Sequence, residues 1–301
     1  MTTADASDGL EVTEVIEGRP RDLGGFEVRR LLPSGATRTH QRVGPFVFFD
    51  HFGPVTFPAG EGLDVRPHPH IALATLTYLF DGEILHRDSL GSQQLIRPGD
   101  VNWMVAGRGI VHSERTPPEV RARGGRMHGL QTWLALPLGA EETSPRFEHH
   151  AGDTIPVVHA HGAELHVVAG TGYGRTAPTG VLSPTLYVHA RLAAGASLAV
   201  DDEHEERAVY VVEGRVACGA RALDAGMMAL LRPRAAVSVR GLAPSRVLLL
   251  GGAPLEGERH IYWNFVSSSR DRIERAKADW REGRFPRVPG DDVEFIPLPP
   301  G

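Results

Sequence analysis

The sequence predicts an all-β protein built from short antiparallel strands, and three observations support this fold class. The 301 residues include 35 glycines and 23 prolines, which favour tight turns over long helices. Short apolar runs, each bounded by turn residues, follow one another at close spacing. Helical periodicity is nearly absent from all but the last part of the chain. Together these features predict an antiparallel barrel or sandwich.

The strands of the first half can be placed from their apolar runs. The Asp81-Gly82 pair separates two such runs, which predicts a hairpin at that point. Pro98-Gly99-Asp100 marks a second turn, and Gly107-Arg108-Gly109 marks a third. The predicted strands are residues 45–49, 73–80, 83–86, 101–105 and 130–137.

The second half repeats this plan faintly. Residues 208–216 align by eye with the run from Thr75 to Ile84, and residues 225–228 correspond to residues 98–101 of the first half. Self-similarity on this scale predicts a duplicated β-domain. We therefore expect a division into residues 1–140 and residues 141–301, with a proline-containing crossing over residues 138–165.

The end of the chain differs in kind. Ser267, Ser268 and Ser269 offer hydroxyls for a helix N-cap, and Ile273 and Ala276 follow at helical spacing. Gly283 and Pro286 should end this helix, and residues 295–300 should form an extended arm.

Composition excludes several classes of function. A net charge of −5 gives no electrostatic footprint for direct binding to nucleic acid. Cys218 is the single cysteine, so an intramolecular disulfide cannot form and a reducing compartment is expected. The N-terminus does not read as a signal peptide, and no apolar run approaches the roughly 18–20 residues of a membrane span. The sequence predicts a cytoplasmic protein that does not enter a membrane.

Two short segments carry residues that ligate metals. In His68-Pro69-His70 and in His112-Ser113-Glu114, the ligand types lie two residues apart, so on a strand each pair points to one side. Two such strands would form a cage of three nitrogens and one oxygen. This set suits Fe, Mn, Ni, Cu or Zn rather than Ca or Mg. The alternative is that the histidines only line a loop, while Glu114 pairs with a neighbouring arginine.

Other residues are weaker candidates. His86 and His128 could lie beside the site or pack elsewhere, and His204 lies in an acidic run at residues 201–206 that is expected to be a solvated loop. The second half is therefore predicted to bind no metal. Possible pocket residues are Gln131, Trp133 and one of the strand neighbours Trp103 and Met104, whose side chains point to opposite faces.

These segments resemble the pirin family. The resemblance rests on residues 43–46, 50–54, 68–70, 75–79, 86–91 and 98–114, of which the last, containing Trp103-Met104 and His112-Ser113-Glu114, is the most specific. It implies a bicupin, in which two antiparallel cupin-type β-barrels face each other and the N-terminal barrel holds one metal ion. The family's ligands correspond to His68, His70, His112 and Glu114. Iron is the first choice, with nickel, manganese, copper and zinc as alternatives.

The resemblance also implies a function. Four ligands leave one or two coordination positions open, which is typical of a catalytic site. Pirin-like proteins are linked to flavonol 2,3-dioxygenase activity, and in that reaction Glu114 would also accept the flavonol hydroxyl proton. The expected partners are then a small aromatic substrate such as quercetin and O2. The alternatives are a metal-dependent, redox-sensitive module that binds a partner protein without turnover, and an oxygenase or isomerase for another metabolite.

Two departures from the family pattern bear on the substrate. Residues 71–74 read Ile-Ala-Leu-Ala where the family commonly has a charged pair, which predicts a more apolar pocket. Residues 260–266 also differ from the usual C-terminal segment, which suggests a distinct subfamily.

Overall fold

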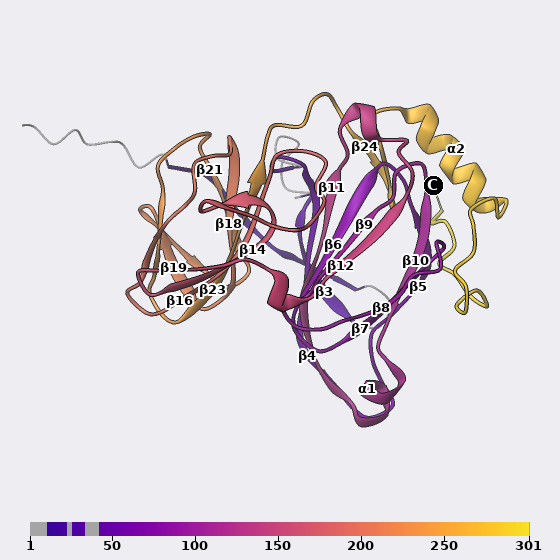
Figure 1. The fold of residues 1–301 in the computed structure, drawn as a ribbon, viewed down its shortest axis with the longest axis horizontal. Coiled ribbons are helices and arrows are strands. Elements are labelled where there is room, and N and C mark those ends of the chain that lie inside the picture. The colour runs from indigo at the N-terminus through magenta and orange to yellow at the C-terminus, as the bar shows by residue number, and fades with distance from the viewer. Residues whose placement is uncertain (1–10, 23–25, 34–41, 301) are drawn as a thin grey trace, which may run out of the picture.

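The chain folds into two lobes, each made of a large and a small antiparallel sheet. The computed structural model describes residues 11–22, 26–33 and 42–300. Figure 1 shows the first lobe in purple and the second in orange.

In the first lobe the large sheet has the order β12 (Arg146–His150), β9 (Val101–Val105), β6 (Leu73–Asp81), β11 (Gly125–Ala135), β4 (Phe46–Phe57), β3 (Glu27–Leu32) and β2 (Arg19–Asp22). Its small sheet has the order β5 (Asp64–His70), β10 (Ile110–Arg115), β7 (Ile84–Asp88) and β8 (Gln93–Ile96).

The second lobe has the same arrangement. Its large sheet runs β1 (Val12–Glu17), β21 (Met227–Leu231), β18 (Glu206–Glu213), β23 (Ser245–Gly252), β16 (Thr185–Leu192), β14 (Ala163–Gly172) and β13 (Val157–Ala160), with β15 (Arg175–Thr176) paired to β14. Its small sheet runs β17 (Ser197–Ala199), β22 (Ser238–Gly241), β19 (Arg215–Cys218) and β20 (Arg221–Asp224). The predicted all-β fold with two antiparallel halves is confirmed.

The two lobes correspond strand by strand, as a duplication requires. The order β9-β6-β11-β4 of the first lobe matches β21-β18-β23-β16 of the second, and β5-β10-β7-β8 matches β17-β22-β19-β20. At Gly82 the chain leaves the large sheet for the small one, and at Gly214 it does the same in the second lobe. The predicted hairpin at Asp81-Gly82 is therefore wrong. Positive φ at Gly82 makes the turn, but β6 pairs with β9 and β11 instead of β7.

The two large sheets pack against each other and form a shared core. On β6, Ala74, Leu76 and Tyr78 face this core, whereas Leu73 and Leu79 face the interior of the first lobe. Because both faces of β6 are buried, its sequence is a nearly continuous apolar run. Phe46 of β4 stacks on Tyr187 of β16, with ring centroids 5.4 Å apart. Hydrophobic burial thus joins the two lobes.

A strand from each side of the expected boundary at residue 140 crosses to the other lobe. Strand β1 pairs with β21 in the second lobe, and β12 pairs with β9 in the first. The expected division into residues 1–140 and 141–301 stays a prediction, and these pairings show that each lobe takes a strand from beyond that line.

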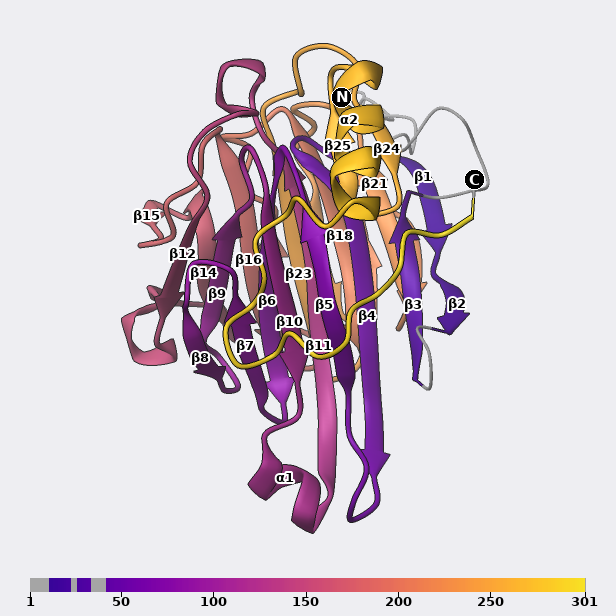
Figure 2. The same cartoon turned by 90° about the vertical axis from the view of Figure 1, so that its right-hand side faces the viewer.

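The C-terminal segment returns to the first lobe after the second lobe is complete (Figure 1). It forms the β24 (His260–Tyr262) and β25 (Phe265–Ser267) pair and then helix α2 (Arg270–Arg281). Ser269 caps α2 by accepting a hydrogen bond from the Arg272 amide, and Ile273 and Ala276 are buried, as predicted. Figure 2 shows the extended tail crossing the strands of the first lobe. A short helix α1 (Pro118–Arg123) separates β10 from β11. Within the part of the chain described, every helix is too short or too polar to span a membrane.

Two histidines are buried at the junction of the lobes. Nδ1 of His51 lies 2.6 Å from the Tyr210 hydroxyl, and Nε2 of His51 lies 2.7 Å from Nε2 of His128. Burial, with a further contribution from His128, lowers the pKa of His51 to about 3. Burial likewise lowers the pKa of His128 to about 4. Both rings are therefore neutral in the folded protein near neutral pH.

These lowered pKa values predict a pH-dependent stability. Unfolded histidine titrates near pH 6.5, so below that pH the unfolded chain binds a proton that folded His51 does not, and acid favours unfolding. We expect His51 alone to reduce the free energy of unfolding by about 1.4 kcal/mol per pH unit between about pH 6 and pH 4. Urea unfolding of wild type and His51→Gln across this range measures the effect. The wild-type curve should be the steeper one, and parallel curves would contradict the assignment.

Candidate metal centre

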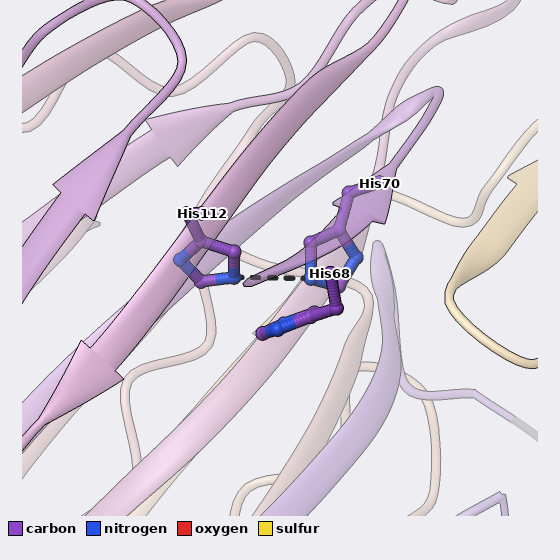
Figure 3. A group of neighbouring side chains, drawn as sticks. All are labelled: His68, His70 and His112. Atoms are coloured by element: carbon purple, nitrogen blue, oxygen red, sulfur yellow. Dashed lines mark hydrogen bonds between the residues drawn. The ribbon is translucent and has the colours of Figure 1, made fainter. Parts of the chain in front are cut away.

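Strands β5 and β10 bring three predicted ligands together. They are antiparallel neighbours in the small sheet, and His112 pairs directly with His68. His68 and His70 lie two residues apart on β5, so their side chains share one face with His112. Each of the three histidines offers a ring nitrogen within 4.8 Å of the other two, and all three are buried. Figure 3 shows the three rings converging on one point.

The hydrogen bonds of two of these rings fit metal binding. Nδ1 of His68 donates to the Arg66 carbonyl at 2.9 Å, and Nδ1 of His70 donates to the Asn264 carbonyl at 3.2 Å. Since a neutral imidazole carries one proton, Nε2 of each ring is left with a free lone pair. Nε2 of His70 lies 3.2 Å from Nε2 of His112. This spacing matches two imidazoles each about 2.1 Å from one shared ion.

Burial also keeps the rings in the form that ligates. It lowers the pKa of His68 to about 4 and lowers the pKa values of His70 and His112 well below the ordinary value, with neighbouring histidines adding to the effect for the latter two. Only neutral imidazole binds a metal ion. The three histidines could therefore hold a divalent metal at neutral pH without first losing protons.

Glu114 lies on the same strand as His112 but is not part of the three-histidine group. The register between β5 and β10 shifts here: His112 faces His68, whereas Glu114 faces Val65. Pro67 has no amide to donate, which accounts for a local irregularity in β5. The Glu114 carboxyl accepts a hydrogen bond from the Thr77 hydroxyl at 3.0 Å. Burial raises its pKa, while His86 and this hydrogen bond act in the opposite direction.

A cavity of about 410 Å³ opens onto His68, His70 and Glu114. Its size lies within the range of roughly 300–1,000 Å³ that is usual for small-molecule sites. One wall is aromatic: the rings of Phe48 and Trp133 stack with centroids 3.8 Å apart. Trp133 also makes an edge contact with His70, at 5.1 Å between centroids. The aromatic pair therefore lies directly beside His70.

An ion pair contributes to the polar lining of this cavity. Arg30 holds Asp50 with two hydrogen bonds of 2.8 Å, and its guanidinium lies 4.4 Å from the centroid of the Phe48 ring. Because the two charges neutralise each other, the pair adds hydrogen-bonding groups without a net charge. Burial raises the pKa of Asp50, and Arg30 opposes that rise.

The weaker sequence candidates fall in different places. Gln131 and Trp133 line the cavity, whereas Trp103 packs in the shared core and Met104 packs beside Trp133. His86 lies behind His112, and His128 lies at the lobe junction with His51. His204 is bonded to Thr171 and is buried, not solvated as expected. The strands that correspond to β5 and β10 are β17 and β22, and they carry no histidine, cysteine or carboxylate.

Residues 71–74 do not make the pocket more apolar, contrary to expectation. None of them lines the cavity. Ile71 instead packs with Phe265 and Ile273 of the C-terminal segment, and Leu73 packs beside Met104. Ile71 therefore contributes to the attachment of the C-terminal segment, whereas Ala74 packs in the core shared by the two lobes.

Sequence reasoning missed the contribution of the C-terminal segment to the site. Trp263, Asn264 and Ile296 line the cavity, and the Asn264 carbonyl orients His70 across a separation of 194 residues. The Ile296 amide donates to the Pro67 carbonyl of β5. Trp263 has a φ of 53°, a left-handed conformation that is costly for a bulky residue and is a recurrent feature of functional sites. The one sequence signal for this contribution was that residues 260–266 depart from the usual family pattern.

Comparison with known proteins agrees with this geometry. Residues 25–134 match the family model described as Pirin, and residues 187–286 match the model described as Pirin C-terminal cupin domain. The chain belongs to the pirin family. It is 50% identical over 288 residues to a pirin-like protein of Caulobacter vibrioides, a match that covers 95% of this chain and 98% of that relative. A pirin-like protein of Solanum lycopersicum is 32% identical, over 91% of this chain and 92% of its own length.

Solved structures support the bicupin architecture of a pirin. The crystal structure of a quercetin 2,3-dioxygenase from Acinetobacter baumannii has a TM-score of 0.88 and 34% identity, and the match covers 96% of this chain and 95% of that one. A bacterial pirin from Escherichia coli in complex with nickel(II) has a TM-score of 0.64 at 20% identity, covering 80% of this chain and 99% of that one. The second likeness concerns the fold alone.

Proposed function

We propose that this pirin is a metal-dependent dioxygenase that uses O2 to open the heterocycle of flavonols such as quercetin. The proposal is carried by one observation: the histidine group borders a cavity whose wall is the stacked pair Phe48 and Trp133. A group that can hold a redox-active ion and an aromatic wall thus border one cavity. The quercetin 2,3-dioxygenase from Acinetobacter baumannii supports the assignment through its similarity over nearly the whole chain.

The proposed ligands are His68, His70, His112 and Glu114, and iron is the proposed metal. When bound, the ion would supply Lewis acidity and open coordination positions at which a chelating substrate and O2 can meet. The protein contributes the fixed orientation of the imidazoles through the Arg66 and Asn264 carbonyls. Such orientation limits the reorganisation needed to assemble the site.

The surrounding residues would position the substrate and move one proton. A planar ring laid against Phe48 and Trp133 gains apolar contact while water is excluded. Glu114 is buried and lines the cavity beside His68 and His70, so its carboxylate lies within the space that a substrate would occupy. It would accept the flavonol hydroxyl proton, and the Thr77 hydroxyl would hold the carboxylate in place from behind.

Flavonol consumption tests the proposal. Metal-free protein is loaded anaerobically with Fe²⁺ or Ni²⁺, quercetin is added, and O2 is then admitted while absorbance is followed. We expect loss of the flavonol spectrum well above the rate given by the same concentration of free metal. Equal rates with protein-bound and free metal would exclude the dioxygenase assignment.

Replacement of Glu114 by glutamine tests its role as proton acceptor. Glu114→Gln keeps the size of the side chain but removes the base, so the turnover number should fall by about 10²- to 10⁴-fold. The matched control is Glu119→Gln, an exposed residue on α1, which should leave turnover unchanged. Metal content is measured in parallel. Loss of the ion from Glu114→Gln would show that Glu114 is needed as a ligand, separately from any role as proton acceptor. Wild-type turnover in Glu114→Gln would remove it from the mechanism.

A further inference from the structure

His112 lacks the carbonyl partner that orients the other two imidazoles. Nδ1 of His68 and Nδ1 of His70 each face a backbone carbonyl, but Nδ1 of His112 faces another ring nitrogen, Nδ1 of His86, at 3.5 Å. A ring nitrogen can donate or accept, so this contact by itself does not determine where the His112 proton lies. Some other group must fix it.

Asp88 determines the proton position on His86. Nε2 of His86 lies 3.1 Å from Oδ2 of Asp88, and both side chains are buried. Oδ1 of the same carboxylate accepts hydrogen bonds from the Leu90 and Ser92 amides, at 2.9 and 3.0 Å. A carboxylate surrounded by three donors is held in its ionised form, which only accepts. Nε2 of His86 must then donate, and a neutral imidazole with its proton there has its lone pair on Nδ1.

We infer that Asp88 and His86 are positioning residues that set the tautomer in which His112 binds a metal ion. A ligand bond at Nε2 of His112 requires the ring proton on Nδ1, and Nδ1 of His86 is placed to accept that proton. Nε2 of His112 and Nε2 of His70 lie 3.2 Å apart and share a hydrogen bond, which an ion between them would replace. Asp88 therefore acts through two rings to prepare the site for a cation.

The surroundings of His86 agree with a fixed orientation. Its ring stacks on Phe147 of β12, with centroids 4.2 Å apart and planes 11° from parallel. Strand β7 pairs with β10 so that His112 lies opposite Asp88 and Glu114 lies opposite His86. The side chains of Asp88, His86 and His112 therefore lie on two adjacent strands of one small sheet. The inference rests on the metal site of the proposed function but not on turnover of a flavonol.

Asp88→Asn is the decisive variant. Its Oδ1 can still accept from the two amides, but its Nδ2 would then face Nε2 of His86 and donate to it. The proton of His86 would move to Nδ1 and would hold that of His112 on Nε2, where it blocks the metal. We expect the affinity for Ni²⁺, measured by competition with a chromophoric chelator, to fall about 10- to 100-fold.

Two substitutions of His86 form a matched pair. His86→Gln retains an acceptor for the His112 proton and should bind Ni²⁺ nearly as wild type does. His86→Phe retains the stacking on Phe147 but removes the acceptor, and it should bind more weakly. Equal affinities for the two variants would overturn the inference, even if Asp88→Asn failed to fold.

Nitrogen-15 NMR of the metal-free proteins reads the tautomer directly and separates this inference from the proposed function. Wild type should carry the His86 proton on Nε2, and Asp88→Asn should carry it on Nδ1. A merely structural role for Asp88 would leave the tautomer of His86 unchanged. Retention of the His86 proton on Nε2 in Asp88→Asn would overturn the inference whether or not the protein oxidises quercetin.

Discussion

Replacing His70 by alanine is expected to weaken metal binding roughly 100-fold. The ring supplies one of three converging nitrogens, and its Nε2 lies 3.2 Å from that of His112. If a metal-binding free energy of about 10–16 kcal/mol is shared by four ligands, one ligand accounts for about 3 kcal/mol, or roughly two powers of ten in affinity. Competition titration with Ni²⁺ measures the loss, and elemental analysis of the purified variant should show less metal than wild type.

His204→Ala is the control for this experiment. His204 is also a buried histidine, but it lies in the second lobe and is bonded to Thr171. Its removal should leave the affinity and stoichiometry for Ni²⁺ unchanged. If His204→Ala lost metal, or if His70→Ala retained wild-type affinity, the ligand set would be misassigned.

Replacing Phe46 by alanine is expected to destabilise the whole molecule by about 3–5 kcal/mol. Phe46 is fully buried in the shared core and stacks on Tyr187 across the lobe junction. The loss combines the transfer of an aromatic side chain out of water with the cavity left behind. Because the core belongs to both lobes, a single unfolding transition should shift as a unit. Urea unfolding monitored by fluorescence and by circular dichroism measures both the shift and the cooperativity.

Val293→Ala provides the reference for that measurement. Val293 is 97% exposed in the C-terminal tail, and its truncation should change the free energy of unfolding by no more than about 0.5 kcal/mol. Two separate transitions in Phe46→Ala would show that the lobes unfold independently, which is contrary to a shared core.

Short sequence patterns were enough to predict the structural features that follow from strand periodicity. The two-residue spacing of His68 and His70 was enough to place both on one face, and the apolar run of β6 was enough to predict a buried strand. The repeat of this plan after residue 200 predicted the duplication, which the matching turns at Gly82 and Gly214 bear out. These properties depend on residues close together in the chain.

Structural features that depend on contacts between residues far apart in the chain could not be predicted from short sequence patterns. The Asp81-Gly82 turn identifies a reversal of the chain, but whether β6 pairs with β7 depends on β9 and β11, which compete for its edges. The register shift between His112 and Glu114 is a property of the pairing of β5 with β10, two strands that are far apart in the chain. The Asn264 carbonyl reaches His70 only because the C-terminal segment returns to the first lobe.

The return of the C-terminal segment has a consequence for the order of assembly during synthesis. Ribosomes make the first lobe early, so His68, His70 and His112 emerge long before the residues that complete their surroundings. Trp263, Asn264 and Ile296 follow only after the strands of the second lobe. The cavity wall is therefore completed only after the second lobe has been made. A nascent first lobe has the three histidines but lacks the carbonyl that orients His70.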